Sequence, residues 1–165
     1  MFPFKFLNQN NLMPSEGTSI FEIGCHDGRI LMPFYREGYK VAGIDIDEAA
    51  ISTAKTTMLE GSFVVGDALQ ANVPDGSFVI IRNVLSFLGT KEKVDRLLMS
   101  LKDHHMFFTF FGPNDELAGK RLVWTRQEVE EICMRIGAVI ADEFDGMSKN
   151  MAGDPRKSHV FTCIK

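Results

Sequence analysis

Short apolar runs alternate along the chain with segments whose apolar residues recur at helical spacing. The runs are typical of buried strands and cover residues 19–23, 40–44, 62–65, 77–81 and 106–111. The helical spacing predicts helices over residues 28–37, 47–60, 94–101 and 125–136. Because strands and helices alternate, the pattern predicts an α/β fold with a parallel sheet and right-handed crossovers.

Local signals predict several helix ends. Asp47 stands where it can cap the second helix, and residues 125–128, Thr-Arg-Gln-Glu, have the form of a capping box. Gly38 follows the first helix and is suited to end it. Pro33 falls inside that helix, so we expect its first turns to be distorted.

Two further apolar runs, residues 139–144 and 159–164, are separated by a loop alone and predict a C-terminal antiparallel hairpin. The predicted fold is therefore α/β, a doubly wound, mostly parallel sheet that ends in this hairpin. The chain has 165 residues, enough for one ordinary domain, which we assign to residues 18–165. Residues 1–17 carry Phe2, Phe4 and Phe6 before a polar run. They form either a tail packed on the domain or a short lid over a site.

Charge and cysteine content narrow the function. The formal net charge is −4, and Lys and Arg form no dense run, which disfavours a nucleic-acid partner. The three cysteines are scattered without a CxxC pair, so we expect neither a disulfide framework nor a metal site. The sequence has no recognisable signal peptide and no apolar stretch of membrane-spanning length. We expect a cytoplasmic protein without membrane contact.

Candidate chemistry begins after the first predicted strand. Gly24 and Gly28 allow a tight turn and let a ligand approach backbone N–H groups at a helix start. A dinucleotide-binding turn would have glycine at positions 24, 26 and 29, but His26 and Arg29 occupy two of these. The turn is better suited to a nucleoside without a pyrophosphate. Arg29 either pairs with a carboxylate or stays solvated.

Two aspartates follow the next two strands. Asp45 ends the second strand, where a carboxylate can accept both hydroxyls of a ribose. Asp67 follows the third strand and is placed to accept an adenine amino group. Either aspartate alone fits a loop residue or a helix cap. Together with Glu22 in the first strand, however, they place acidic residues at three successive strand ends. This succession predicts an adenosine-containing ligand.

These segments resemble the class I S-adenosylmethionine-dependent methyltransferases, in the order of that family and over roughly residues 12–111. The matching stretches are residues 20–29, 43–47, 65–68, 74–78 and 82–88. His26 in place of a central glycine, and Val79 in place of a frequent Asp, depart from the family pattern. The resemblance implies a Rossmann-like fold and S-adenosylmethionine as cofactor.

The resemblance also implies roles for single residues. The loop over residues 24–28 would hold the methionine part, and Glu22 would order either this loop or the amino group of the methionine part. Asp45 would bind the ribose, and residues 67–68 would frame the adenine. Residues 83–87 would line the floor of the pocket. The implied cofactor-binding residues are Glu22, Gly24, Cys25, His26, Gly28, Asp45, Ile46, Asp67, Ala68, Asn83, Val84 and Phe87.

The C-terminal part resembles the tellurite-resistance-type branch of small-molecule methyltransferases. The matching stretches are residues 110–115, 124–125 and 153–161. In that branch, basic residues and a histidine near the last hairpin are thought to face the substrate, which implies a catalytic role for Arg156, Lys157 and His159. From the residues alone, the alternative is a solvated hairpin loop with His159 satisfied at the sheet edge.

The expected function is S-adenosylmethionine-dependent methylation of an unidentified small molecule by a monomer or homodimer. Methyl transfer from a sulfonium is an in-line displacement that needs mainly alignment, so it requires no obvious catalytic dyad. The short segment before the first strand and His26 favour the alternative of a cofactor-binding module without methyl-transfer activity. The missing fingerprint glycines disfavour a nicotinamide-dependent oxidoreductase.

Overall fold

The computed structural model describes residues 3–149 and 154–165. The chain divides into two compact units, Met1–Ile81 and Arg82–Lys165. Two residues of the sequence interpretation, Phe2 and Gly153, lie outside the described residues.

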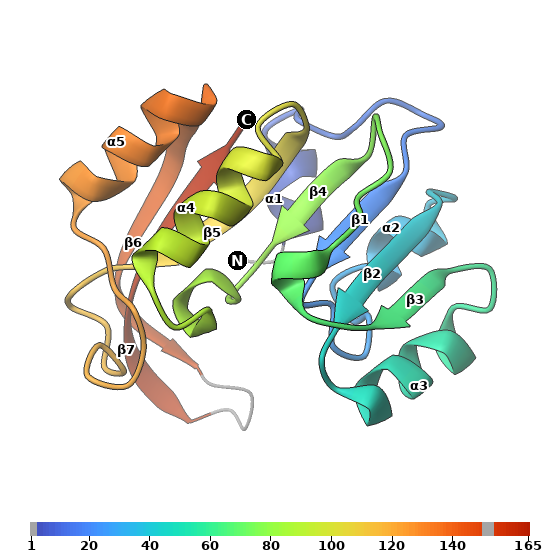
Figure 1. Ribbon diagram of the computed structural model, residues 1–165, viewed down its shortest axis with the longest axis horizontal. Helices are drawn as coiled ribbons and strands as arrows, with labels where there is room; N and C mark the ends of the chain where they lie inside the picture. The colour runs from blue at the N-terminus through green and yellow to red at the C-terminus, as the bar shows by residue number, and fades with distance from the viewer. Residues whose placement is uncertain (1–2, 150–153) are drawn as a thin grey trace. The chain divides into compact units, whose positions relative to one another are not determined.

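The first unit is built on four parallel strands in the order β3-β2-β1-β4 (Figure 1). These are β1 (Ile20–Ile23), β2 (Val41–Asp45), β3 (Ser62–Val65) and β4 (Phe78–Ile81). Every residue of β1 and β4 is buried, which is typical of inner strands of a parallel sheet. Ile23 pairs with Ile44, and Asp45 with Val65. The carboxyl ends of β1, β2 and β3 therefore meet at one edge of this sheet.

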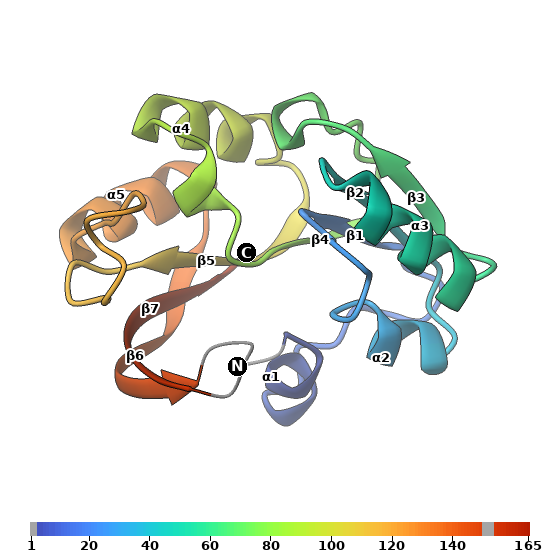
Figure 2. The ribbon, with the colours of Figure 1, turned by 90° about the horizontal axis from the view of Figure 1, so that it is seen from below.

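The described helices of the first unit are α1 (Pro3–Gln9), α2 (Met32–Arg36) and α3 (Glu48–Thr57), with a short 3₁₀ turn η1 (Ala68–Gln70). Asp47 caps α3 as predicted, because its Oδ1 accepts a hydrogen bond from the Ala50 N–H at 3.0 Å. Helices α1 and α2 lie next to each other (Figure 2), joined by an edge-on contact between Phe4 and Phe34 at 5.0 Å.

The prediction of a helix over residues 28–37 is wrong at its amino end, because α2 begins only at Met32. Gly28 has a positive φ of 76°, which no α-helical residue adopts, and residues 28–31 form turns. Pro33 then falls in the first turn of α2, where its missing N–H costs nothing. The helix α1 was not predicted; it buries Phe6 and Leu7.

The second unit contains three strands in the order β5-β7-β6, and β7 is antiparallel to both β5 and β6. These are β5 (His105–Phe111), β6 (Val139–Lys149) and β7 (Pro155–Ile164), accompanied by α4 (Lys91–Ser100), α5 (Arg126–Ile136) and a 3₁₀ turn η2 (Leu85–Phe87). The predicted C-terminal hairpin is confirmed, with longer strands than expected. The capping box at Thr125 is also confirmed, since Thr125 and Glu128 exchange side-chain to backbone hydrogen bonds.

One glycine of β2 is required by close packing. A Cβ at Gly43 would lie 2.6 Å from the Cβ and 2.7 Å from the Sγ of Cys25, and 3.1 Å from the carbonyl oxygen of Glu22. These atoms belong to a short side chain and a paired backbone, so neither can move aside at little cost. The absence of a side chain at position 43 therefore lets the turn after β1 lie directly on β2.

We expect Gly43→Ala to lower the free energy of unfolding by about 1–3 kcal/mol, the usual cost of overpacking a tight interior. Denaturant unfolding of the variant and the parent measures this change. Gly119→Ala is the matched control, because a Cβ there meets no atom within 4 Å. That control should stay within about 0.5 kcal/mol of the parent. Equal stabilities of the two variants would contradict this account of the β2 packing.

Candidate functional site

The loop over residues 24–28 folds back onto β2. The N–H groups of Gly24 and Cys25 both donate to the carbonyl oxygen of Ile44, at 2.8 and 3.1 Å. Gly24, His26 and Gly28 have positive φ values of 75°, 48° and 76°, so every second residue is left-handed. This alternation produces a tight concave turn at the carboxyl end of β1, and most of its backbone N–H groups are bonded within the chain.

Gly28 is fixed by its surroundings as well as by its φ. A Cβ at this position would collide with the end of the Met58 side chain and would lie 3.4 Å from the Cβ of Ala54, both from the α3 region. The turn is thus held between β2 on one side and α3 on the other.

The Asp45 carboxylate ties this turn to the start of α3. Its Oδ2 accepts the His26 N–H at 2.8 Å, and its Oδ1 accepts the Asp47 N–H at 2.9 Å. A carboxylate oxygen can accept two hydrogen bonds, so both oxygens keep capacity for further donors. Asp45 is partly exposed, and that capacity faces a position accessible to a ligand.

The residue after Asp45 has an apolar side chain that is exposed to solvent. Ile46 is 81% exposed, so its aliphatic surface is accessible to a ligand. The N–H of Gly66 donates to the Asp45 carbonyl oxygen at 2.9 Å, which brings the end of β3 alongside. Asp67 is exposed, and its Oδ1 accepts the Leu69 N–H at 2.8 Å; Ala68 follows in η1. Asp67 therefore caps η1 through one oxygen, which leaves the other for a further donor.

The other polar groups of the turn are internally paired. Arg29 donates from Nε and Nη2 to the Asp27 carboxylate at 2.8 and 2.6 Å, so carboxylate pairing is the arrangement adopted by Arg29. This side-chain hydrogen bonding holds the pKa of Asp27 well below its usual range. Burial, with smaller contributions from Glu22 and Asp45, raises the pKa of the Cys25 thiol, which is therefore not a thiolate nucleophile. Glu22 itself is buried within β1.

Three of the predicted cofactor residues belong to the second unit. Asn83 lies two residues after β4, has a positive φ of 61°, and donates its N–H to the Thr109 Oγ1 at 3.1 Å. Val84 precedes η2 and is partly buried, and Phe87 ends η2 with 65% of its surface exposed. Phe87 is thus a second large apolar side chain left uncovered.

The predicted catalytic histidine lies on β7 and is buried. Its Nε2 is 3.1 Å from the Glu143 Oε1, and its ring lies 4.8 Å from that of Phe161. Its Nδ1 is also buried and makes no hydrogen bond within the described part of the chain. Gly112 allows this position, because a Cβ at residue 112 would overlap the His159 ring. His159 is therefore not part of a solvated loop.

The two predicted basic residues have different surroundings. Arg156 is partly buried, and its Nε donates to the Ser158 Oγ at 3.3 Å. Lys157 is exposed, and its backbone pairs with Glu116: the Glu116 N–H donates to the Lys157 carbonyl, and the Lys157 N–H to the Glu116 Oε2, each at 3.1 Å. Neighbouring side chains on a strand point to opposite faces, so these two cations do not face the same side of β7.

A buried ion pair in the loop between β5 and α5 was not predicted from the sequence. The side chains of Asp115 and Arg121 are paired and only 0% and 3% exposed. The Arg121 guanidinium lies 3.2 Å above the centre of the Phe111 ring. Burial lowers the pKa of Arg121, and Asp115 opposes that shift. No sequence signal marks this pair, because Asp and Arg in a polar loop are ordinarily solvated.

Two further features are absent from residues 3–149 and 154–165. No helix there combines the length and the apolar character needed to cross a membrane. No group of three or more His, Cys, Asp or Glu side chains there is arranged to hold a metal ion.

Comparisons with solved structures show the fold. The chain is similar to an S-adenosylmethionine-dependent methyltransferase of Methanosarcina mazei, with a TM-score of 0.74 and 18% identity over 100% of this chain and 98% of that one. It is similar to TehB of Haemophilus influenzae, with a TM-score of 0.76 and 15% identity over 98% of this chain and 61% of that one. It is also similar to magnesium protoporphyrin IX methyltransferase of Synechocystis with bound S-adenosylhomocysteine. The TM-score is 0.71 and the identity is 20%, over 98% of this chain and 79% of that one. The predicted Rossmann-like α/β fold, mostly parallel with a C-terminal antiparallel hairpin, is confirmed.

Comparisons of sequence show the family. A stretch of 52 residues is 40% identical to a ubiquinone biosynthesis O-methyltransferase of Mesorhizobium japonicum, and it spans 32% of this chain but only 21% of that protein. Residues 20–104 match the family described as a methyltransferase domain. This match covers just over half of the chain and contains the ends of β1, β2 and β3 that surround Asp45. The chain therefore belongs to the methyltransferase domain family, as its resemblance to the class I S-adenosylmethionine-dependent methyltransferases predicted.

Proposed function

We propose that the chain transfers a methyl group from S-adenosylmethionine to a small-molecule acceptor. The observation that carries this proposal is the Asp45 carboxylate. It is held by two backbone N–H groups from different segments, retains acceptor capacity, and lies beside the exposed Ile46. In a doubly wound sheet, the edge at the carboxyl ends of the strands is where such ligands bind.

The residues of the first unit fit the cofactor. Asp45 would accept the ribose hydroxyls, and Ile46 would be covered by the flat face of the adenine, which removes apolar surface from water. Asp67 would accept the adenine amino group through the oxygen not used by Leu69. The turn over residues 24–28 would hold the methionine part in its concave side. When bound, the cofactor supplies an electrophilic methyl group on a sulfonium.

The second unit supplies candidates for the acceptor side. The Glu143 carboxylate can only accept from the His159 Nε2, so this contact fixes the orientation of the His159 ring beside a candidate acceptor side. Arg156 and Lys157 face opposite sides of β7, so one of the two cations would attract an anionic or polar acceptor on its own side. The tellurite-resistance-type pattern of this segment, and the fold shared with TehB, support the assignment to a small-molecule branch.

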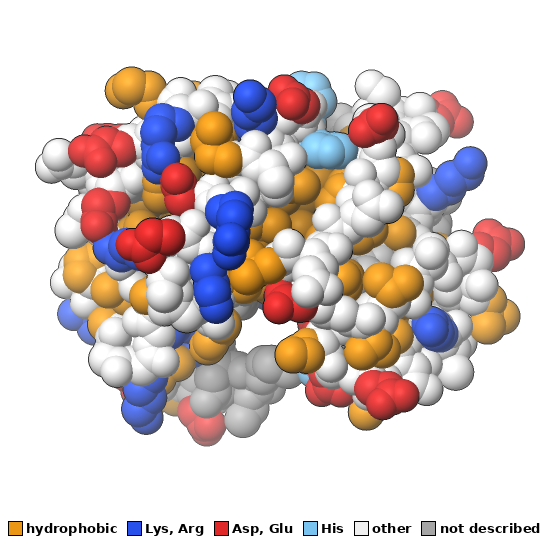
Figure 3. Space-filling view, viewed as in Figure 1, with side chains coloured by type: hydrophobic (Ala, Val, Ile, Leu, Met, Phe, Trp, Pro, Cys, Tyr) orange, Lys and Arg blue, Asp and Glu red, His pale blue; other side chains and the backbone are white. Residues whose placement is uncertain are grey.

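The surface charge also favours a small acceptor over nucleic acid. In Figure 3, basic side chains over α4 and α5 are interspersed with acidic ones instead of forming a stripe. Two of these cations are paired: Lys91 with Glu128 at 2.6 Å, and Arg135 with Asp95 at 2.9 Å. Paired cations are poorly suited to neutralise a phosphate backbone.

The proposal is tested by incubating the chain with labelled S-adenosylmethionine and a panel of acceptors. The panel contains thiols, oxyanions of tellurium and selenium, amines, phenols and carboxylates. Label transfer to one class, with release of S-adenosylhomocysteine, is the expected result. Tight cofactor binding without transfer to any class would instead favour a binding module without methyl-transfer activity, and tighter binding of NAD would contradict the cofactor assignment.

We expect Asp45→Ala to weaken S-adenosylmethionine binding roughly 5- to 150-fold, because a ribose hydroxyl without its acceptor costs about 1–3 kcal/mol. Calorimetry measures the affinity. Asp47→Ala is the control at a neighbouring carboxylate: it removes the cap of α3 and should cost about 1 kcal/mol of stability while leaving affinity nearly unchanged. If the two variants bind the cofactor equally well, the ribose role of Asp45 is wrong.

We expect His159→Ala to lower turnover while cofactor affinity stays within about twofold, because a proton acceptor for the methyl acceptor acts mainly in the transition state. Unfolding curves and rates per folded molecule separate this effect from lost packing. Arg156→Ala should chiefly raise the Michaelis constant of the acceptor, and more so at low salt, where attraction is less screened. Unchanged rates in folded His159→Ala would leave this histidine with a structural role only.

A further inference from the structure

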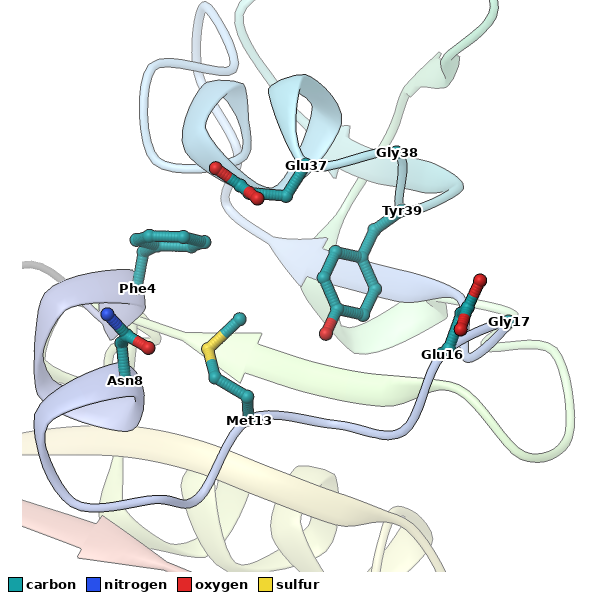
Figure 4. Close-up of a pocket in the computed structure, with 8 residues that line it drawn as sticks. All are labelled: Phe4, Asn8, Met13, Glu16, Gly17, Glu37, Gly38 and Tyr39. Carbon is teal, nitrogen blue, oxygen red and sulfur yellow. The ribbon is translucent and has the colours of Figure 1, made fainter.

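The first unit contains a cavity far from the site described above. Its volume is about 400 Å³, and its lining includes Phe4, Asn8, Met13, Glu16, Glu37 and Tyr39 (Figure 4). Glu16 lies just before β1 and Tyr39 just before β2, so the cavity is at the amino ends of these strands. Gly24 and Asp45 follow the carboxyl ends of the same strands, so the two sites are separate.

The rings of Phe4 and Tyr39 line the cavity, and both of them pack against Phe34. Phe34 is fully buried and makes edge-on contacts with Phe4 at 5.0 Å and with Tyr39 at 6.0 Å. The Tyr39 hydroxyl donates to the Pro14 carbonyl oxygen at 2.7 Å, so its polar group is already satisfied. In Figure 4 the Met13 thioether lies between the two rings. A ligand in this cavity therefore meets aromatic and polarizable surface.

The charged groups of the lining are both carboxylates. Glu37 ends α2, where its N–H donates to the Phe34 carbonyl oxygen at 3.1 Å, and in Figure 4 its side chain lies on the same side of the cavity as the Phe4 ring. Glu16 lies beyond Tyr39. Within residues 3–149 and 154–165, neither carboxylate forms an ion pair. The lining thus combines two carboxylates with two aromatic rings.

We propose that this cavity binds a small organic cation, an ammonium ion with a short apolar body. Aromatic faces attract cations through their quadrupole, and the attraction is strongest where carboxylates add to it and water is partly excluded. An anion would be repelled, and a neutral molecule of the same shape would gain only the apolar contact. This site is additional to the proposed methyl transfer and does not depend on it.

The test is calorimetry on the full chain with choline and with dimethylbutanol, the neutral alcohol in which carbon replaces the choline nitrogen. Choline should bind at least about threefold more tightly, and its affinity should fall as salt is added. Glu37→Gln should weaken choline binding about two- to fivefold and leave the alcohol unaffected. Because Glu37 is exposed, this variant is expected to fold. Glu48→Gln, an equal change of charge on the exposed start of α3, should bind choline as the parent does.

Three outcomes would overturn the proposal. The first is equal or undetectable binding of choline and dimethylbutanol by the parent chain. The second is the same choline affinity in Glu37→Gln and Glu48→Gln. The third is displacement of choline by S-adenosylhomocysteine, which would mean that choline occupies the edge near Asp45. Absence of methyl transfer in the acceptor screen would leave all three results, and therefore this proposal, unchanged.

Discussion

One carboxylate has to satisfy two backbone N–H groups from different segments, and the arrangement of the first unit depends on it. Asp45 accepts from His26 in the turn after β1 and from Asp47 at the start of α3. The turn lies against β2 because Gly43 has no side chain, and Gly28 adopts the positive φ that the turn requires. The turn after β1 and the start of α3 are thereby fixed around a single acceptor group.

The second unit buries several polar side chains, and each of them needs a polar partner. Its core is rich in phenylalanine, yet His159, Asp115 and Arg121 are buried within it. Buried polar groups cost free energy unless they are paired, and here Glu143 pairs with His159 while Asp115 pairs with Arg121. Glu116 also forms two hydrogen bonds with the Lys157 backbone. The start of β7 is therefore held by polar contacts from Glu143 and Glu116 in addition to its backbone pairing with β6.

The features that depend on a few neighbouring residues are predicted correctly from the sequence. Strand runs, the cap at Asp47, the capping box at Thr125 and the C-terminal hairpin each depend on a few neighbouring residues, and each is confirmed. The helix α1 and the late start of α2 depend on packing between segments, and they were missed. The pair of Asp115 and Arg121 and the cavity beside Tyr39 arise only when separate loops meet, so composition and spacing carry no trace of them. For the cofactor and catalytic residues, the structure supplies positions, and their roles stay predictions.

The left-handed backbone of His26 has a consequence for ligand recognition. A glycine at this position would reach the same φ of 48° without strain, but it would sample many more conformations when the turn is free. Histidine is among the few other residue types that tolerate the left-handed region, and it restricts the unliganded turn to fewer states. A preorganised turn loses less conformational entropy when a ligand binds. The residue that departs most visibly from the family pattern therefore makes the turn more rigid in advance of its ligand.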